Sequence, residues 1–60
     1  MNLKNFRIDN DIKQVEIAKI LGITQQQYSL YENEYRSIPV DLVIKLCRYY
    51  HVSSDYILGI

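Results

Sequence analysis

Apolar residues recur along this chain at the three- and four-residue spacing of helices, and no segment alternates as a half-buried strand does. The pattern predicts five short helices, over residues 3–9, 14–21, 25–32, 39–50 and 54–58. Their connections of about two to six residues are normal for a compact helical domain. We therefore expect an all-α, compact five-helix fold in a single domain over residues 1–60, without internal repeats or a linker.

The same spacing predicts which side chains face the core. The inward positions are Leu3 and Phe6 in the first helix, Val15, Ile17, Ala18 and Leu21 in the second, and Tyr28 and Tyr31 in the third. In the fourth helix they are Val40, Val43, Cys47 and Tyr50, flanked by Ile44 and Leu46.

Residues 22–33 carry the clearest local signal. Thr24 followed three residues later by Gln27 is a capping box, in which the threonine hydroxyl accepts from the Gln27 N–H and the Gln27 amide oxygen accepts from the Thr24 N–H. Ile23 before the cap and Tyr28 four residues after it form the matching hydrophobic staple. The third helix is therefore predicted to begin directly after Thr24.

The other boundaries vary in quality. Asn2 and Ser53 are expected to cap the first and last helices through their side-chain oxygens. Gly22 stands where a helix ends in the left-handed conformation, and Pro39 suits a first helical position. Lys13 stands where a hydroxyl or carboxylate would cap the second helix, so that start is poor.

Composition narrows the function. A chain that is 48% hydrophobic and 23% charged is globular, and its seven basic and seven acidic residues cancel. An overall basic excess, which is typical of nucleic-acid binders, is missing, so only a local surface can serve that purpose. The single cysteine fits a reducing cytoplasm. No membrane span and no secretory leader are expected.

The second and third helices together form a helix-turn-helix. Small Ala18 lets the two helices approach, and Gly22 frees the turn from a Cβ penalty. Here the sequence resembles the phage repressor and Cro-like (XRE) family of lambda-repressor-like DNA-binding domains. The resemblance lies in Leu3-x-x-Phe6-Arg7, Gln14-Val15-Glu16-Ile17-Ala18-x-x-Leu21-Gly22-Ile23-Thr24, Tyr31-Glu32-Asn33, Pro39, Leu46-Cys47-x-x-Tyr50 and Val52-Ser53-x-Asp55-Tyr56-x-Leu58-Gly59.

This resemblance implies a transcriptional regulator, most often a repressor, that binds a double-stranded DNA operator. In the family the second helix of the motif enters the major groove, and a homodimer spans two half-sites. The resemblance further implies a cytoplasmic, nucleoid-associated protein encoded by a bacterium or a phage, without catalytic residues and without a cofactor.

The candidate base contacts lie on the third helix. Gln25 and Gln26 occupy its first two positions, and a glutamine amide can pair bidentately with N6 and N7 of adenine. Ser29 and Leu30 face the same way, and Leu30 can contact a thymine methyl group. The alternative for these residues is an ordinary solvated helix surface, on which a single leucine is unremarkable.

The candidate phosphate contacts surround that helix. The resemblance assigns this role to Gln14, at the start of the second helix, and to Asn33, after the third. Lys13 and Arg36 are the charged candidates, and Gln27 can serve as either a cap or a phosphate contact. Scattered basic residues are also common on any solvated surface, so that alternative stays open.

Two further sets follow from the resemblance. Arg7 and Glu32 match a pair that forms an internal salt bridge between the first and third helices. At the end of the chain, Tyr56, Ile57 and Ile60 match the residues of a small symmetric dimer interface.

Other features favour different functions to different degrees. Cys47 and His51 are four residues apart, but a zinc site needs three or four ligands and no second pair is present, so no metal is expected. The family usually has glycine at the positions of Asp11, Glu34 and His51. Because Glu34 puts a carboxylate beside the expected phosphate contact, the alternative function is a protein-interaction module, such as an antagonist, an adaptor or an antitoxin-type partner of a related regulatory protein. An enzyme is disfavoured, since no nucleophile–base pair, carboxylate dyad or phosphate loop is present.

Overall fold

The structure, a computed structural model, describes residues 2–59 and is entirely helical over that range. Its helices are α1 (Leu3–Asp9), α2 (Gln14–Leu21), α3 (Gln25–Glu32), α4 (Val40–Tyr50) and α5 (Ser54–Leu58). The predicted bounds hold except at Pro39, which precedes α4 instead of opening it. Pro39 is extended (φ −60°, ψ 144°), and its carbonyl oxygen accepts from the N–H groups of Leu42 and Val43, so it occupies the N-cap position.

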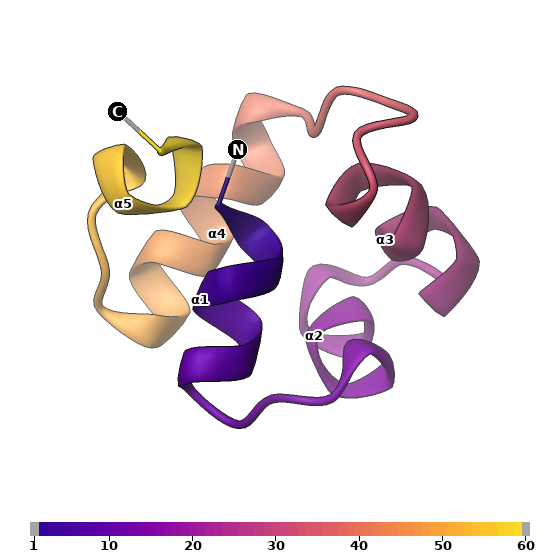
Figure 1. The fold of residues 1–60 in the computed structure, drawn as a ribbon, viewed down its shortest axis with the longest axis horizontal. Coiled ribbons are helices and arrows are strands. Elements are labelled where there is room, and N and C mark those ends of the chain that lie inside the picture. Colours follow the sequence, from indigo (N-terminus) through magenta and orange to yellow (C-terminus); the bar gives the residue numbers. More distant parts are fainter. Residues whose placement is uncertain (1, 60) are drawn as a thin grey trace.

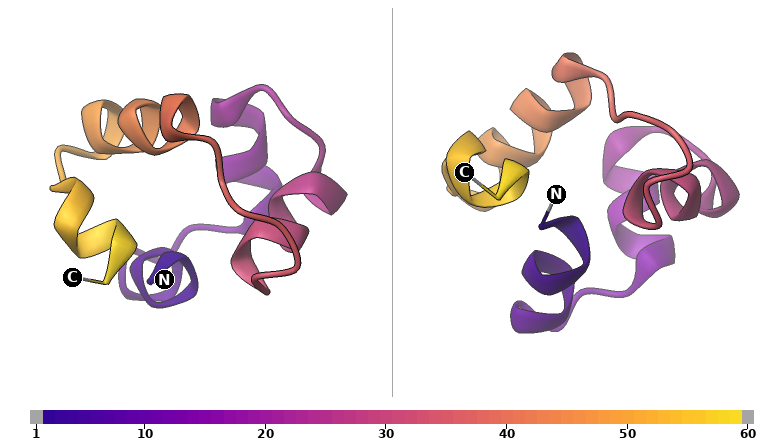
Figure 2. Two further views of the ribbon diagram at one scale, coloured as in Figure 1. Left: turned by 90° about the horizontal axis from the view of Figure 1, so that it is seen from above. Right: turned by 45° about the horizontal axis from the view of Figure 1, so that its top comes forward.

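The helices enclose a common core. Figures 1 and 2 show α5 beside α1 at one end of the molecule and the α2–α3 pair at the other, and α4 contacts both α5 and α2. Helix α3 contacts α2, whereas α5 contacts both α4 and α1. The Asn2 N–H donates to the Ile57 carbonyl oxygen at 2.8 Å, which ties the start of α1 to α5.

The core takes side chains from every helix and from two connecting segments. Its buried apolar members are Leu3, Phe6, Ile12, Ile17, Ala18, Leu21, Tyr28, Ile38, Val43, Leu46 and Ile57. Ile12 and Ile38 lie outside the helices, where helical spacing gives no signal, and the sequence pattern missed them.

Two residues expected to face the core lie outside it. Val15 is 56% exposed, because the inward stripe of α2 runs from Gln14 through Ile17 to Leu21 and passes it by. Val40 is 71% exposed. It begins the first turn of α4, before the stripe that starts at Val43.

The predicted caps are present at α3 and α5 and differ at α1. The Thr24 hydroxyl accepts from the Gln27 N–H at 3.1 Å, and the Thr24 N–H donates to the Gln27 amide oxygen at 3.2 Å. The Ser53 hydroxyl accepts from the Tyr56 N–H at 3.2 Å. The Asn2 amide oxygen instead accepts from the Asn5 side chain, because its backbone (φ −115°, ψ 24°) is not in the extended conformation of a side-chain cap.

The residues that stand in place of the family's usual glycines have left-handed backbones. Asp11, Glu34 and His51 have φ values of 56°, 63° and 57°. This conformation costs a non-glycine residue about 1–2 kcal/mol. A left-handed backbone is therefore the physical reason for glycine at these positions, where the resemblance implies it.

Candidate nucleic-acid interface

The α2–α3 pair has the geometry of a helix-turn-helix. Gly22 ends α2 with φ 72°, and its N–H donates to the Lys19 carbonyl oxygen at 3.1 Å. The next N–H, from Ile23, donates to the Ala18 carbonyl oxygen at 3.0 Å. Ala18 is buried where the helices meet. Helix α3 thus follows directly after this turn and begins at Gln25.

Helix α3 presents polar side chains to solvent. Of its residues only Tyr28 is buried. Gln25 and Gln26 are exposed, whereas Ser29 and Leu30 are partly exposed. The predicted base-contacting residues therefore all lie on one helix and are all accessible.

An ion pair fixes the far end of α3. The Arg7 Nε donates to Glu32 Oε2 at 2.8 Å and the Arg7 Nη2 donates to Glu32 Oε1 at 3.0 Å. The Arg7 Nη1 donates to the Ile12 carbonyl oxygen at 3.0 Å. The side chains of Arg7 and Glu32 are 17% and 2% exposed. The expected pair is thus present as a bidentate, largely desolvated link from α1 to α3.

The ion pair shifts the protonation of its members. Burial alone would raise the pKa of Glu32, but hydrogen bonds from Arg7 and Gln14 outweigh it and lower the pKa. The hydrogen bond to Glu32 is the main cause that raises the pKa of Arg7. Burial, reinforced by the nearby carboxylate, raises the pKa of Tyr28, whose buried hydroxyl makes no hydrogen bond among the described residues. Arg7 and Glu32 are both charged at neutral pH.

The Gln14 amide connects this ion pair to the start of α3. Its Nε2 donates to Glu32 Oε1 at 3.2 Å, and its Oε1 accepts from Gln25 Nε2 at 3.4 Å. Gln14, expected as a phosphate contact, therefore also touches an expected base contact. The sequence carried no signal for the bond to Glu32, because the two residues are distant in the chain and meet only through packing.

The remaining candidate phosphate contacts differ in their exposure and in whether their side chains already make hydrogen bonds within the protein. Lys13, Gln27 and Arg36 are exposed, although the Gln27 oxygen belongs to the capping box. The Asn33 Nδ2 donates to the Ser29 carbonyl oxygen at 3.0 Å and to the Ser29 hydroxyl at 3.2 Å. The Asn33 amide must leave these partners before it can donate to a phosphate.

The expected dimer residues are mostly occupied within the protomer. Ile57 is completely buried in the core, so its expected place at an interface is wrong, because α5 packs this side chain toward α1 and α4. The Tyr56 hydroxyl donates to Asp9 at 3.3 Å, and the Tyr56 ring lies edge-on to Phe6 at 6.0 Å. Ile60 lies outside the described residues. Within the described part of α5, the exposed large apolar side chain is Leu58, which is not among the expected interface residues.

No group of three or more metal-ligating side chains occurs within residues 2–59. Over the same residues, no helix is long and apolar enough to cross a membrane. His51 ends α4 with a left-handed backbone, and Cys47 is partly buried against the core. Both residues thus have structural positions.

The fold and this surface define a small helix-turn-helix domain. A comparison with protein families matches residues 3–57 to the family described as helix-turn-helix. The chain belongs to this family.

Named relatives carry the same region. The chain is 36% identical over 58 residues to antitoxin PezA of Streptococcus pneumoniae and, over the same length, to the uncharacterized HTH-type transcriptional regulator YobD of Bacillus subtilis. It is 40% identical over 57 residues to the HTH-type transcriptional regulator ImmR of Bacillus subtilis. No solved structure matches the chain.

These alignments cover 97%, 97% and 95% of this chain but only 37%, 52% and 45% of PezA, YobD and ImmR. The chain thus spans about half the length of these relatives or less. The similarity extends to the helix-turn-helix region and not to the rest of those proteins.

Proposed function

We propose that this domain binds double-stranded DNA at a specific operator and acts as a transcriptional regulator, most simply a repressor. One observation carries the proposal: α3 exposes an almost wholly polar face, while a capping box and an ion pair hold its two ends. The names of YobD and ImmR as transcriptional regulators support it.

In this proposal the residues divide by role. Gln25, Gln26, Ser29 and Leu30 contact base edges in the major groove, with the recognition helix spanning about residues 25–32. Gln14, Gln27, Lys13 and Arg36 contact phosphates, and Asn33 joins them once its amide leaves Ser29. Phosphate contacts set the register of the helix, and base contacts set the sequence.

A homodimer would place two such helices in successive turns of the groove. Tyr56, Leu58 and Ile60 are the residues of the C-terminal end that we assign to its interface. The binding unit is then a pair of protomers on a two-fold symmetric site, and its affinity depends on protein concentration.

Selection of bound sequences from random duplexes tests the proposal. We expect a two-fold symmetric site, with affinity that falls with salt by a log–log slope of about −0.9 per phosphate contacted. The double variant Gln25→Ala with Gln26→Ala should lose the site preference. The control Arg48→Ala, which removes a charge from α4 outside the motif, should keep it. Failure to select any site, together with salt-independent affinity, would refute DNA binding.

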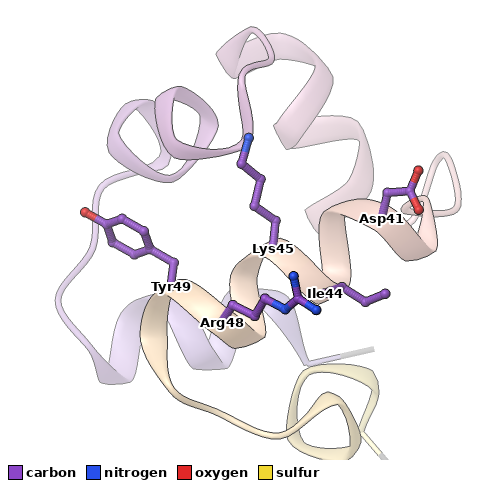
Figure 3. Close-up of a pocket in the computed structure, with 5 residues that line it drawn as sticks. All are labelled: Asp41, Ile44, Lys45, Arg48 and Tyr49. Carbon is purple, nitrogen blue, oxygen red and sulfur yellow. The ribbon is translucent and has the colours of Figure 1, made fainter.

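A protein-interaction module is the second candidate, and the outer face of α4 favours it. Ile44 and Tyr49 are exposed there and line an open depression of about 370 Å³ with Asp41, Lys45 and Arg48 (Figure 3). The name of PezA as an antitoxin and the balanced net charge agree with this candidate. An interaction module would keep its activity in the Gln25→Ala, Gln26→Ala variant and lose it on Tyr49→Ala.

A further inference from the structure

A chain of side-chain hydrogen bonds runs from the ion pair to the first residue of α3. Arg7 donates to Glu32, the Gln14 amide nitrogen donates to Glu32 Oε1, and the Gln25 amide nitrogen donates to the Gln14 oxygen. Glu32 is the charged acceptor of this chain. Arg7 and Gln14 donate to it directly, and Gln25 is linked to it through Gln14. The Glu32 side chain is only 2% exposed, so water has little access to replace its bonds with Arg7 and Gln14, whereas the bond between Gln14 and Gln25, at 3.4 Å, is exposed.

The chemistry of Glu32 gives this chain one direction. An ionised carboxylate only accepts hydrogen bonds, so Gln14 must turn its nitrogen toward Glu32 and its oxygen away. Gln25 must then turn its nitrogen toward that oxygen, because the reverse orientation would place the two amide oxygens, which both only accept, against each other. The Gln25 oxygen and its second N–H are left to face a partner.

Gln26 offers an internal comparison. Its side chain is exposed and makes no hydrogen bond within the described residues, so its amide can turn either way. The neighbouring glutamines therefore differ in physical state. Gln25 presents its acceptor and donor in the order that its bond to Gln14 favours, and Gln26 presents them in whichever order a base edge demands.

We propose that Glu32 is a positioning residue for DNA recognition: it fixes the orientation of the Gln25 amide through Gln14 and so restricts the base pair that Gln25 accepts. This inference rests on the proposed function for its consequence at DNA. The ordering of the amides is independent of DNA and can be tested in the free protein. Glu32 thus does more than stabilise the fold with Arg7.

The first experiment follows the side-chain amide signals of the glutamines by NMR in the free protein. E32Q replaces the carboxylate with a group that can both donate and accept. We expect it to shift the Gln14 and Gln25 signals and to speed their hydrogen exchange about fivefold, the factor that one ordinary hydrogen bond contributes to an equilibrium. The Gln26 signals should not change.

Two further variants separate ordering from stability. R7K keeps the positive charge but breaks the bidentate ion pair; it should lower stability and leave the Gln25 signals in place. The double variant Q14E/E32Q moves the carboxylate to position 14, where it again only accepts from Gln25, and should restore the slow hydrogen exchange of the Gln25 amide. The proposal is overturned if E32Q leaves the Gln25 signals unchanged, if R7K shifts those signals as far as E32Q does, or if Q14E/E32Q does not restore the slow hydrogen exchange.

The second experiment measures base discrimination on the selected operator. The base pair that faces Gln25 is identified as the one whose preference disappears in Gln25→Ala. E32Q should reduce discrimination at that pair about fivefold and leave the pair that faces Gln26 unaffected, whereas R7K should change neither. An equal loss at every position would show a purely structural role and overturn the proposal. If no operator is selected at all, the proposed function fails, and the NMR result stands by itself.

Discussion

Helices α3 and α4 are held in the fold by different means. Helix α4 contributes Val43 and Leu46 to the buried core, and partly buried Leu42, Cys47 and Tyr50 pack beside them. Helix α3 buries Tyr28 alone, with partly buried Tyr31 packed against the core beside it. Its other attachments are polar and lie at its ends, where the capping box fixes the start and Glu32 fixes the finish.

The difference has a functional consequence. A helix held by an apolar stripe gives that stripe to the core, and the width of the stripe limits what remains exposed. A helix held at its ends keeps most of its surface for a partner. The disadvantage is that α3 depends on a few polar groups, whose loss or protonation releases it, whereas the apolar contacts of α4 do not depend on protonation.

The largest effect that tests this comparison is removal of the Glu32 side chain. Glu32→Ala leaves Arg7 without its partner and should lower the free energy of unfolding by about 3–5 kcal/mol. A domain of this size has about 3–9 kcal/mol in total, so the variant should unfold at a much lower denaturant concentration than the wild type.

Glu16 is the matched control, because it is an exposed carboxylate on α2. Glu16→Ala should cost about 1 kcal/mol or less. A similarly small cost for Glu32→Ala would show that the ion pair does not hold α3.

The corresponding test on α4 removes part of its buried stripe. Leu46 is completely buried, so Leu46→Ala should lower stability by about 2–5 kcal/mol through lost burial and the cavity left behind. Ile44→Ala on the exposed side of the same helix should cost well under half as much. Equal costs, measured by thermal unfolding, would contradict the assignment of α4 to apolar packing.

Acid should distinguish the two kinds of attachment. The pKa of Glu32 in the fold is lowered from an unfolded value of about 4.3. The stabilisation from Glu32 is therefore complete above that value and is lost as the pH falls through the folded pKa. Unfolding midpoints taken from neutral pH to about pH 2 should fall less steeply for Glu32→Gln than for the wild type. Parallel curves would show that Glu32 does not carry the acid dependence.

The same contrast explains what the sequence could predict. The starts of α3 and α5 and the end of α2 depend on neighbouring residues such as Thr24, Ser53 and Gly22, so local patterns were sufficient. Burial of Ile12 and Ile38 depends on how the helices pack, and spacing within a helix holds no information about it.

The candidate site divides in the same way. The accessibility of the glutamines at the start of α3 followed from their place after a cap. The bond between Gln14 and Glu32 and the burial of Ile57 arise only when three helices come together. The resemblance supplied the Arg7–Glu32 pair, since no local pattern connects residues on different helices.

The side-chain caps at the starts of α2 and α3 also differ, and a substitution can remove this difference. Lys13 precedes α2 in the extended backbone of an N-cap (φ −80°, ψ 149°) but makes no side-chain cap. Lys13→Thr should therefore raise stability by about 0.5–2 kcal/mol, as measured by denaturant unfolding. Lys13→Ala is the control for lost charge and should give no such gain. A lower stability for Lys13→Thr would contradict the boundary of α2.

The smallest expected effect concerns how α2 and α4 end. Both end in a left-handed residue, Gly22 after α2 and His51 after α4, with φ values of 72° and 57°. His51→Gly removes a backbone cost of about 1–2 kcal/mol. Glycine also loses more chain entropy on folding, which offsets roughly 0.5–1 kcal/mol of this gain. The free energy of unfolding should therefore rise by about 0.5–1 kcal/mol.

Gly22→Ala is the reverse test. A Cβ atom there would meet nothing within 4 Å, so any loss reports the backbone alone and should be about 1 kcal/mol. Thermal unfolding of both variants gives the two values under the same conditions. Opposite signs would show that a single conformational cost acts at both helix ends. A loss on His51→Gly would mean that the His51 side chain contributes more to the end of α4 than its backbone costs, and helix α4 would then also depend on a polar group at its end, as α3 does.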